Sequence, residues 1–165
     1  MRSRKAIRII VVFFIVIFNV SCDQISKAVV RERIGEDEEI VLIANHFILT
    51  KVENTGAFLS AGNSLPHAVK TIFLSVLPML ALAYGLFFVF TKENLSGAIT
   101  MGLCFFIGGG IGNIYDRIVH GSVTDFLHID FVLFQTGIFN MADVSIMAGM
   151  LMILVTAFRQ EEFIP

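Results

Sequence analysis

The sequence contains no tryptophan and few charged side chains. Charged residues make up 16% of its 165 positions, whereas 56% are hydrophobic. Soluble domains are about a quarter charged, so this balance argues against a soluble domain and favours a protein of the lipid bilayer. The net charge of -2 argues against a nucleic-acid partner. Without tryptophan, only Tyr84 and Tyr115 can supply an aromatic belt at the membrane interfaces.

The sequence also lacks the common patterns of metal and serine chemistry. Its two cysteines, Cys22 and Cys104, lie in apolar stretches without the paired spacing of a disulfide or a zinc site. There is no His-Glu-x-x-His motif, and Ser122 has no surrounding Gly-x-Ser-x-Gly. The histidines show no ligand spacing either; they are His46, His67, His120 and His128.

Long hydrophobic runs are what the sequence does have. A membrane-spanning helix needs about 20 mostly apolar residues. Three runs come close to this length, at residues 71–90, 98–115 and 141–158. Pro78 is expected to kink the first of them rather than end it. The spacing of Gly108 and Gly112 predicts that another helix approaches the second run closely.

A shorter apolar run, residues 9–20, has two interpretations. The basic residues before it and the Ser-Cys pair after it are typical of a cleavable signal peptide, even one of the lipoprotein type. However, Asn19 stands at the position where a lipoprotein cleavage site prefers a leucine-like residue. A helical pattern also continues to Lys27, whose side chain we expect to snorkel toward water. We therefore favour an uncleaved first span at about residues 9–27.

Basic residues at the N-terminus predict its side of the membrane. Lysine and arginine accumulate on the cytoplasmic side, so the N-terminus should lie there, and four spans return the C-terminus to the same side. Lys27, Arg31 and Arg33 fall on the outer side and count against this orientation. The sequence thus predicts a multi-pass protein with both termini in the cytoplasm.

Two segments face outward in this arrangement, residues 31–70 and 116–140. The run 41–52 is rich in β-branched and aromatic residues and predicts strands, and a further strand is indicated across 127–134. The expected fold is an all-α integral membrane protein, a four-transmembrane-helix bundle with a small extracytoplasmic β-sheet and loop. We expect one membrane-embedded domain over residues 1–165.

Polar residues gather at the outer ends of the predicted spans. Ionisable groups at membrane depth are costly and mark functional sites by default. The residues of this cluster are Asp23, Asn54, Asn113, Asp116, Arg117, Asp125, Asn140 and Asp143.

Asp125, in a predicted loop, and Asp143, at a predicted helix start, are placed where they could meet. Two close carboxylates share one proton, so that one takes a proton from water while the other polarises a carbonyl. The helix N-terminus favours the charged form of Asp143 and hence its role as the base.

Ordinary structural roles would explain the same residues. Asp143 can be a first-turn capping acid, Asp125 a loop residue, and Asp116 with Arg117 a structural ion pair. The asparagines beside them can bridge helices by hydrogen bonds. Spacing alone leaves both interpretations open.

Five short stretches match, in chain order, the pattern of one known family. They are Asp23-Gln24-Ile25-Ser26-Lys27, Asn54-Thr55-Gly56-Ala57-Phe58, Gly109-Gly110-Ile111-Gly112-Asn113-Ile114-Tyr115-Asp116-Arg117, Val123-Thr124-Asp125-Phe126 and Phe139-Asn140-Met141-Ala142-Asp143. Each stretch alone is unspecific, but the ordered set resembles the lipoprotein signal peptidases, or signal peptidase II, which are four-span aspartic peptidases of bacterial inner membranes.

The resemblance implies a site and a substrate. Asp125 and Asp143 would be the catalytic pair. Other residues of the cluster would shape the site or hold the substrate backbone; they are Asp23, Asn54, Asn113, Asp116, Arg117 and Asn140. The family cuts prolipoproteins just before a cysteine that carries a diacylglyceryl group, uses no metal or cofactor, and is inhibited by globomycin. The expected partners are lipid-modified prolipoprotein and membrane lipid, and the chain is expected to act as a monomer, with its first span retained.

Two other functions were weighed against this one. A non-enzymatic membrane protein, such as a transporter subunit or assembly factor, would use the polar cluster for ions or partners, but its charges should cross the membrane rather than stop at one face. Another class of intramembrane aspartyl protease requires Gly-x-Gly-Asp, whereas here Gly110-Ile111-Gly112 is followed by Asn113.

Overall fold

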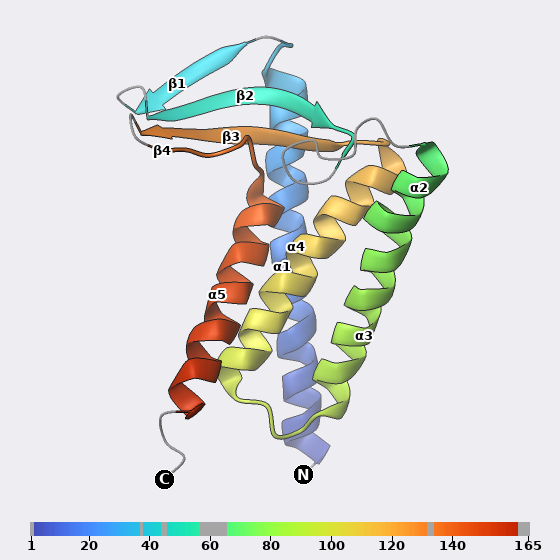
Figure 1. Cartoon of the computed structure of the whole chain (residues 1–165). Coiled ribbons are helices and arrows are strands. Elements are labelled where there is room, and N and C mark those ends of the chain that lie inside the picture. The colour runs from blue at the N-terminus through green and yellow to red at the C-terminus, as the bar shows by residue number, and fades with distance from the viewer. Residues whose placement is uncertain (1, 37, 44–45, 57–65, 132–133, 162–165) are drawn as a thin grey trace.

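The computed structural model describes residues 2–36, 38–43, 46–56, 66–131 and 134–161. In this part of the chain, long helices stand side by side and a small sheet covers one end of the bundle (Figure 1). Both ends of the chain lie at the opposite end of the bundle (Figure 1). Ala57 and Phe58, which belong to one of the family motifs, lie outside the described residues.

The described residues contain 4 helical rods that are long and apolar enough to cross a membrane. The predicted four-span architecture is therefore confirmed, and the protein is a multi-pass membrane protein. One rod is built from three consecutive segments. The helices are α1 (Arg2–Arg33), α2 (His67–Thr71), η2 (Ile72–Val76), α3 (Leu77–Thr91), α4 (Gly97–Val119) and α5 (Met141–Glu161).

Pro78 changes the second rod without ending it, as expected. The proline is in the first turn of α3, and the five residues before this turn form the π-helical segment η2. Proline has no N–H, and its ring collides with the carbonyl four residues earlier, here that of Leu74. A wider π turn accommodates that carbonyl and lets the rod continue.

Glycines on α4 let two other helices approach closely. A side chain at Gly108 would meet Asn19 of α1 at 2.7 Å, and one at Gly112 would collide with the Asp23 carboxylate. A side chain at Gly109 would collide with the backbone oxygen of Ala142 on α5. The approach expected at Gly108 and Gly112 is therefore present, and it is made by α1.

The outer segments form an antiparallel sheet in the order β1-β2-β3-β4 within the described chain. Its strands are β1 (Glu39–Ile43), β2 (Phe47–Asn54), β3 (Val123–Phe131) and β4 (Phe134–Gln135). The strands predicted within 41–52 are confirmed, whereas the single strand indicated across 127–134 is the end of β3 and the start of β4. The predicted loop position of Asp125 is wrong. Asp125 lies within β3 and pairs with Val52 of β2. Val123 and Phe126 are buried, so this stretch behaves as a packed strand.

We expect Gly109→Ala to destabilise the bundle by about 1–3 kcal/mol, the usual cost of overpacking a tight contact. The colliding atom of Ala142 belongs to the α5 backbone and cannot turn away as a side chain would. Thermal unfolding in detergent measures the effect. Gly97→Ala is the matched control, because a side chain there meets nothing within 4 Å. Equal melting temperatures for the two variants would contradict the close contact.

Candidate active site

A buried ammonium group lies at the outer end of the bundle. Lys27 is 0% exposed, and its Nζ lies 2.8 Å from Asp23 and 2.8 Å from Asp116, which are equally buried. The expectation that Lys27 snorkels to water is wrong, because two inward-facing carboxylates offer the ammonium a better place. Asp116 does not form the ion pair with Arg117 that was one of its alternative structural roles; it pairs instead with Lys27 and with Arg31, at 3.0 Å.

This network changes the meaning of the outer-side cations. Lys27 and Arg31 are paired with carboxylates, and Arg31 also donates to the hydroxyl of Thr124 at 2.7 Å. Cations committed to internal ion pairs are structural components of the fold. Their position therefore carries little weight against a cytoplasmic N-terminus.

The same network fixes the start of α5. Asp23 accepts a hydrogen bond from the backbone N–H of Ala142 at 2.9 Å. Lys27 donates a further hydrogen bond to Oδ1 of Asn113 at 2.9 Å. A side-chain amide whose oxygen is held in this way must point its nitrogen elsewhere, and Nδ2 of Asn113 donates to Asp143 at 2.9 Å.

Asp125 and Asp143 are brought together by one asparagine. Nδ2 of Asn140 donates to Asp125 at 2.6 Å, and the backbone N–H of Asn140 donates to Asp143 at 3.1 Å. The second oxygen of Asp125 accepts from Nδ2 of Asn54 at 3.0 Å. Every expected asparagine of the cluster thus contacts one or both carboxylates.

The structural roles considered above are also present at Asp143. Its backbone N–H donates to the side chain of Asn140 at 3.0 Å, so the two residues cap the start of α5 reciprocally. Asn140 and Asn113 also bridge α5 and α4 at 3.1 Å. The cap occupies one oxygen of Asp143, while its other oxygen faces Asn113.

Burial raises the pKa of Asp125 to about 6, and the nearby charge of Asp143 adds to the shift. Hydrogen bonds from Asn54 and Asn140 favour the ionised form and limit the rise in this pKa. A carboxyl group with such a pKa gains and loses its proton near neutral pH. The pair can therefore hold one proton under the conditions in which a membrane enzyme works.

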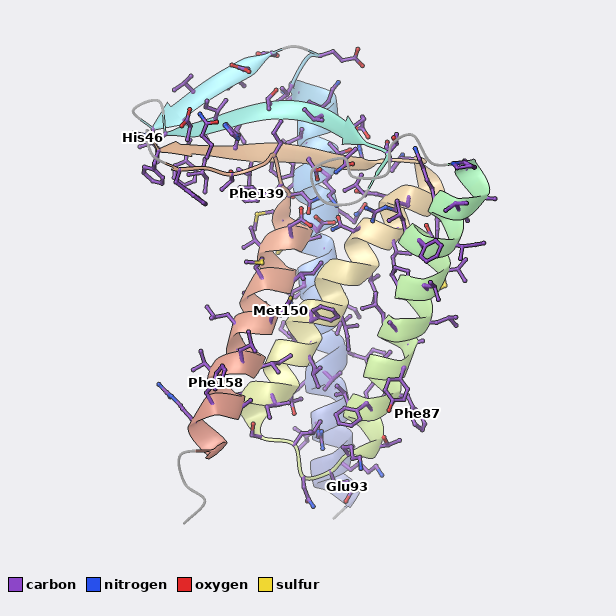
Figure 2. The ribbon with its side chains drawn as sticks, in the orientation of Figure 1. His46, Phe87, Glu93, Phe139, Met150 and Phe158 are labelled. Carbon is purple, nitrogen blue, oxygen red and sulfur yellow. The ribbon has the colours of Figure 1, made fainter. Side chains whose placement is uncertain are left out.

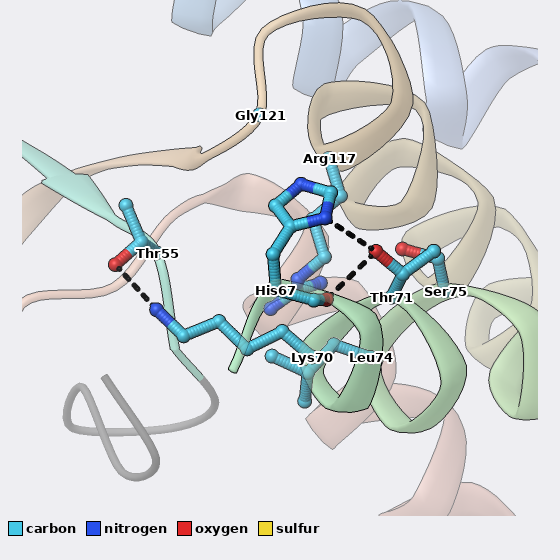
Figure 3. A pocket seen from close by; sticks show the side chains of 8 residues that line it. All are labelled: Thr55, His67, Lys70, Thr71, Leu74, Ser75, Arg117 and Gly121. Atoms are coloured by element: carbon cyan, nitrogen blue, oxygen red, sulfur yellow. Dashed lines mark hydrogen bonds between the residues drawn. The ribbon is translucent and has the colours of Figure 1, made fainter. Parts of the chain in front are cut away.

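Arg117 lies near both carboxylates and also lines a pocket at the rim of the bundle. Its guanidinium donates to the backbone oxygens of Asn113 at 3.3 Å and Gly56 at 3.1 Å. The pocket has a volume of about 220 Å³ and opens beside α2 (Figure 3). It is lined by Thr55, His67, Lys70, Thr71, Leu74, Ser75, Arg117 and Gly121.

Sequence reasoning missed two contributors to the site. Lys27 was read as a surface residue, although its spacing of four from Asp23 on a helix is the usual spacing of an ion pair. Glu53 was not singled out at all. It accepts hydrogen bonds from Ser122 and, at 2.7 Å, from Thr124, and so ties β2 to β3 beside Asp125. Nothing in the spacing of Glu53 indicated this role.

Comparison with known proteins identifies the family. The family model described as signal peptidase (SPase) II matches residues 12–159. This chain belongs to the signal peptidase II family. It is therefore a peptidase, and the expectation of an enzyme is confirmed.

Relatives and solved structures agree with this membership. The lipoprotein signal peptidase of Halothermothrix orenii is 32% identical, over 92% of this chain and 97% of its own. That of Clostridium novyi is 30% identical, over 88% of this chain and 96% of its own. A bacterial membrane enzyme solved at 2.3 Å shares the fold with a TM-score of 0.81 and 22% identity, covering 92% of this chain and 89% of its own.

We expect Lys27→Met to destabilise this signal peptidase II by about 3–5 kcal/mol, because it leaves buried carboxylates without their cation. Thermal unfolding in detergent measures the loss. Lys5→Met is the matched control: Lys5 pairs with Glu93 at 3.1 Å, but both side chains are more than half exposed, at 58% and 60%. Its removal should change little. A Lys27 variant as stable as the Lys5 variant would contradict the network.

Proposed function

We propose that this chain removes the signal peptide from diacylglyceryl-modified prolipoproteins, cutting before the lipidated cysteine at the outer face of the bacterial inner membrane. The observation that carries the proposal is the pair Asp125 and Asp143, held against a common asparagine at one end of a membrane bundle. Curated relatives named lipoprotein signal peptidase support the choice of substrate.

The two carboxyl groups divide the work of hydrolysis. Asp143, ionised, takes a proton from a water molecule, whose oxygen then attacks the carbonyl carbon of the scissile peptide bond. Asp125, protonated, gives its proton to the carbonyl oxygen as the tetrahedral intermediate forms. The intermediate, a gem-diol, collapses when its C–N bond breaks. The proton held by Asp143 passes to the leaving amine of the cysteine, and one hydroxyl of the gem-diol returns its proton to Asp125, which leaves a carboxyl group on the signal peptide and restores the pair. The raised pKa of Asp125 supports this division of roles.

The position of the pair suits a lipidated substrate. Asp143 is in the first turn of α5 and Asp125 is on the strand above it, so the pair lies at the rim of the apolar bundle. The acyl chains of the substrate would stay in the bilayer and bring the bond after the signal peptide to this depth. Asp23, Asn113 and Arg117 would hold the site in shape around it.

The opposite end of the bundle would lie in the cytoplasm. Arg8 donates to the backbone oxygens of Val89 and Glu93 there, and Lys5 pairs with Glu93. Basic residues at this end support the cytoplasmic placement of both termini. We further propose that residues 1–165 act as one domain and as a monomer surrounded by membrane lipid, because sheet and bundle together build a single site.

Asp125→Asn and Asp143→Asn should each abolish cleavage, because either change removes a group that must exchange a proton. A gel assay on purified diacylglyceryl-modified prolipoprotein measures the product, and thermal unfolding shows that each variant is folded. Asp130→Asn is the matched control, since it makes the same change further along the same strand, at a residue whose carboxylate accepts a hydrogen bond from Gln135 at 2.9 Å. Retained cleavage by Asp125→Asn or Asp143→Asn would contradict the proposal that the two aspartates are the catalytic pair.

The pH dependence of cleavage should follow Asp125. Since its pKa is about 6 and its proton is needed, kcat/KM should fall as the pH rises through about 6. Asn54→Ala removes a hydrogen bond that favours the ionised form, so the pKa rises and the fall should move to higher pH. Asn94→Ala, in the exposed connection at the other end of the bundle, is the control. An unmoved pH profile in the Asn54 variant would speak against Asp125 as the acid.

A further inference from the structure

One end of the sheet carries apolar side chains that no described element covers. Ile43 is 60% exposed, Phe131 48% and Phe134 63%. These three residues, which we call the sheet tip, come from the end of β1, the end of β3 and the start of β4. Exposed apolar residues that gather in one place indicate an interaction surface.

The sheet tip is held together by His46. The His46 ring stacks on that of Phe131, with centroids 5.0 Å apart, and its Nδ1 lies 2.7 Å from the backbone oxygen of Asp130. The backbone N–H of Asp130 donates to the oxygen of His46 at 2.9 Å. Two hairpin ends are thereby joined, so the sheet tip can act as one surface.

The sheet tip lies beside the bundle rather than above it. The sheet extends sideways past the outer end of α5, and His46 marks that end (Figures 1 and 2). Phe139, just before α5, exchanges backbone hydrogen bonds with Leu127 of β3 at 2.8 and 2.9 Å. These bonds hold this edge of the sheet beside the start of α5, at the outer end of a helix long and apolar enough to span the membrane.

Below the sheet tip, the outward face of α5 is apolar. Val144, Met147 and Leu151 are exposed on this membrane-spanning helix, as lipid-facing residues are. The sheet tip lies beyond the outer end of this helix (Figure 1). Burial of the Phe131 and Phe134 rings in lipid at this position would remove apolar surface from water, which is favourable. The carboxylates of Glu38 and Glu39, which would be repelled by anionic headgroups, lie at the opposite end of β1.

We propose that the sheet tip inserts into the outer leaflet at the boundary of headgroups and acyl chains, with lipid as its partner. The insertion has a consequence for Asp125, which lies six positions before Phe131 on β3, or about 20 Å along the strand. A strand fixed in the bilayer at one end keeps Asp125 at a constant height above the lipid. This inference concerns the membrane alone and does not depend on the substrate proposed above.

The absence of tryptophan from the chain permits a direct test. Phe134→Trp and, separately, Phe131→Trp introduce a single tryptophan, and the protein is reconstituted in phosphatidylcholine vesicles with or without bromines on the acyl chains. Met147→Trp on the lipid-facing side of α5 is the positive control. Glu39→Trp, exposed at the far end of β1, is the negative control. Thermal unfolding of each variant in detergent shows that it is folded.

We expect bromolipid to quench both sheet-tip tryptophans at least half as strongly as it quenches the tryptophan at position 147, and to leave the one at position 39 unquenched. Quenching at position 134 no stronger than at position 39 would overturn the proposal. A blue-shifted emission that bromolipid does not quench and that grows with the protein-to-lipid ratio would also overturn it, because the sheet tip would then be covered by a second copy of the chain.

Discussion

The buried ammonium of Lys27 is the interaction on which the rest of the site depends. It lies 2.8 Å from each of two carboxylates that have no contact with water, Asp23 and Asp116. Without the cation, Asp23 would be an uncompensated charge inside the bundle, and Asp116 would be left with Arg31 as its ion-pair partner, so the contact between α1 and α4 would be weakened. The third hydrogen bond of the ammonium orients Asn113, and Asn113 in turn donates to Asp143. One side chain therefore both stabilises the bundle and sets the direction of a carboxylate that we propose to be catalytic.

Room for this network comes from residues without side chains. At Gly112 a side chain would occupy the place of the Asp23 carboxylate, and at Gly109 it would occupy that of the Ala142 oxygen. The glycine face of α4 thus brings α1 within reach of Asp116, and α5 within reach of Asn113. The close packing of these helices therefore determines where the carboxylates of Asp23, Asp116 and Asp143 lie. The sheet then adds Asp125 from above, and Asn140 joins the two parts of the site.

The bundle could be predicted because a segment that spans the membrane must make its backbone hydrogen bonds within itself. Long apolar runs such as 71–90 therefore have to be helices. A run rich in β-branched and aromatic residues likewise predicted the strands near Val52. The strand position of Asp125 escaped prediction, because its partner Val52 is distant in sequence. The burial of Lys27 escaped it as well, since the direction of its side chain is decided by Asp116 on another helix. The sequence motifs predicted which residues form the site. The structure was needed to show that the amides of Asn113 and Asn140 connect the two aspartates to the rest of the site.

The hydrogen bonds that Asp125 and Asp143 accept come from amide groups, whereas the nearby cations Lys27 and Arg117 act on the pair through their charge, and this difference matters for the chemistry of the site. A cation in contact with Asp125 or Asp143 would favour the ionised form of both, and the pair would have no proton to share. Lys27 and Arg31 are instead paired with Asp23 and Asp116, and their link to the pair is an amide. Asn54 and Asn140 supply Asp125 with hydrogen bonds but no charge, so burial prevails and its pKa stays near 6. Amides can position a carboxyl group while leaving it able to hold a proton, which a closer lysine could not.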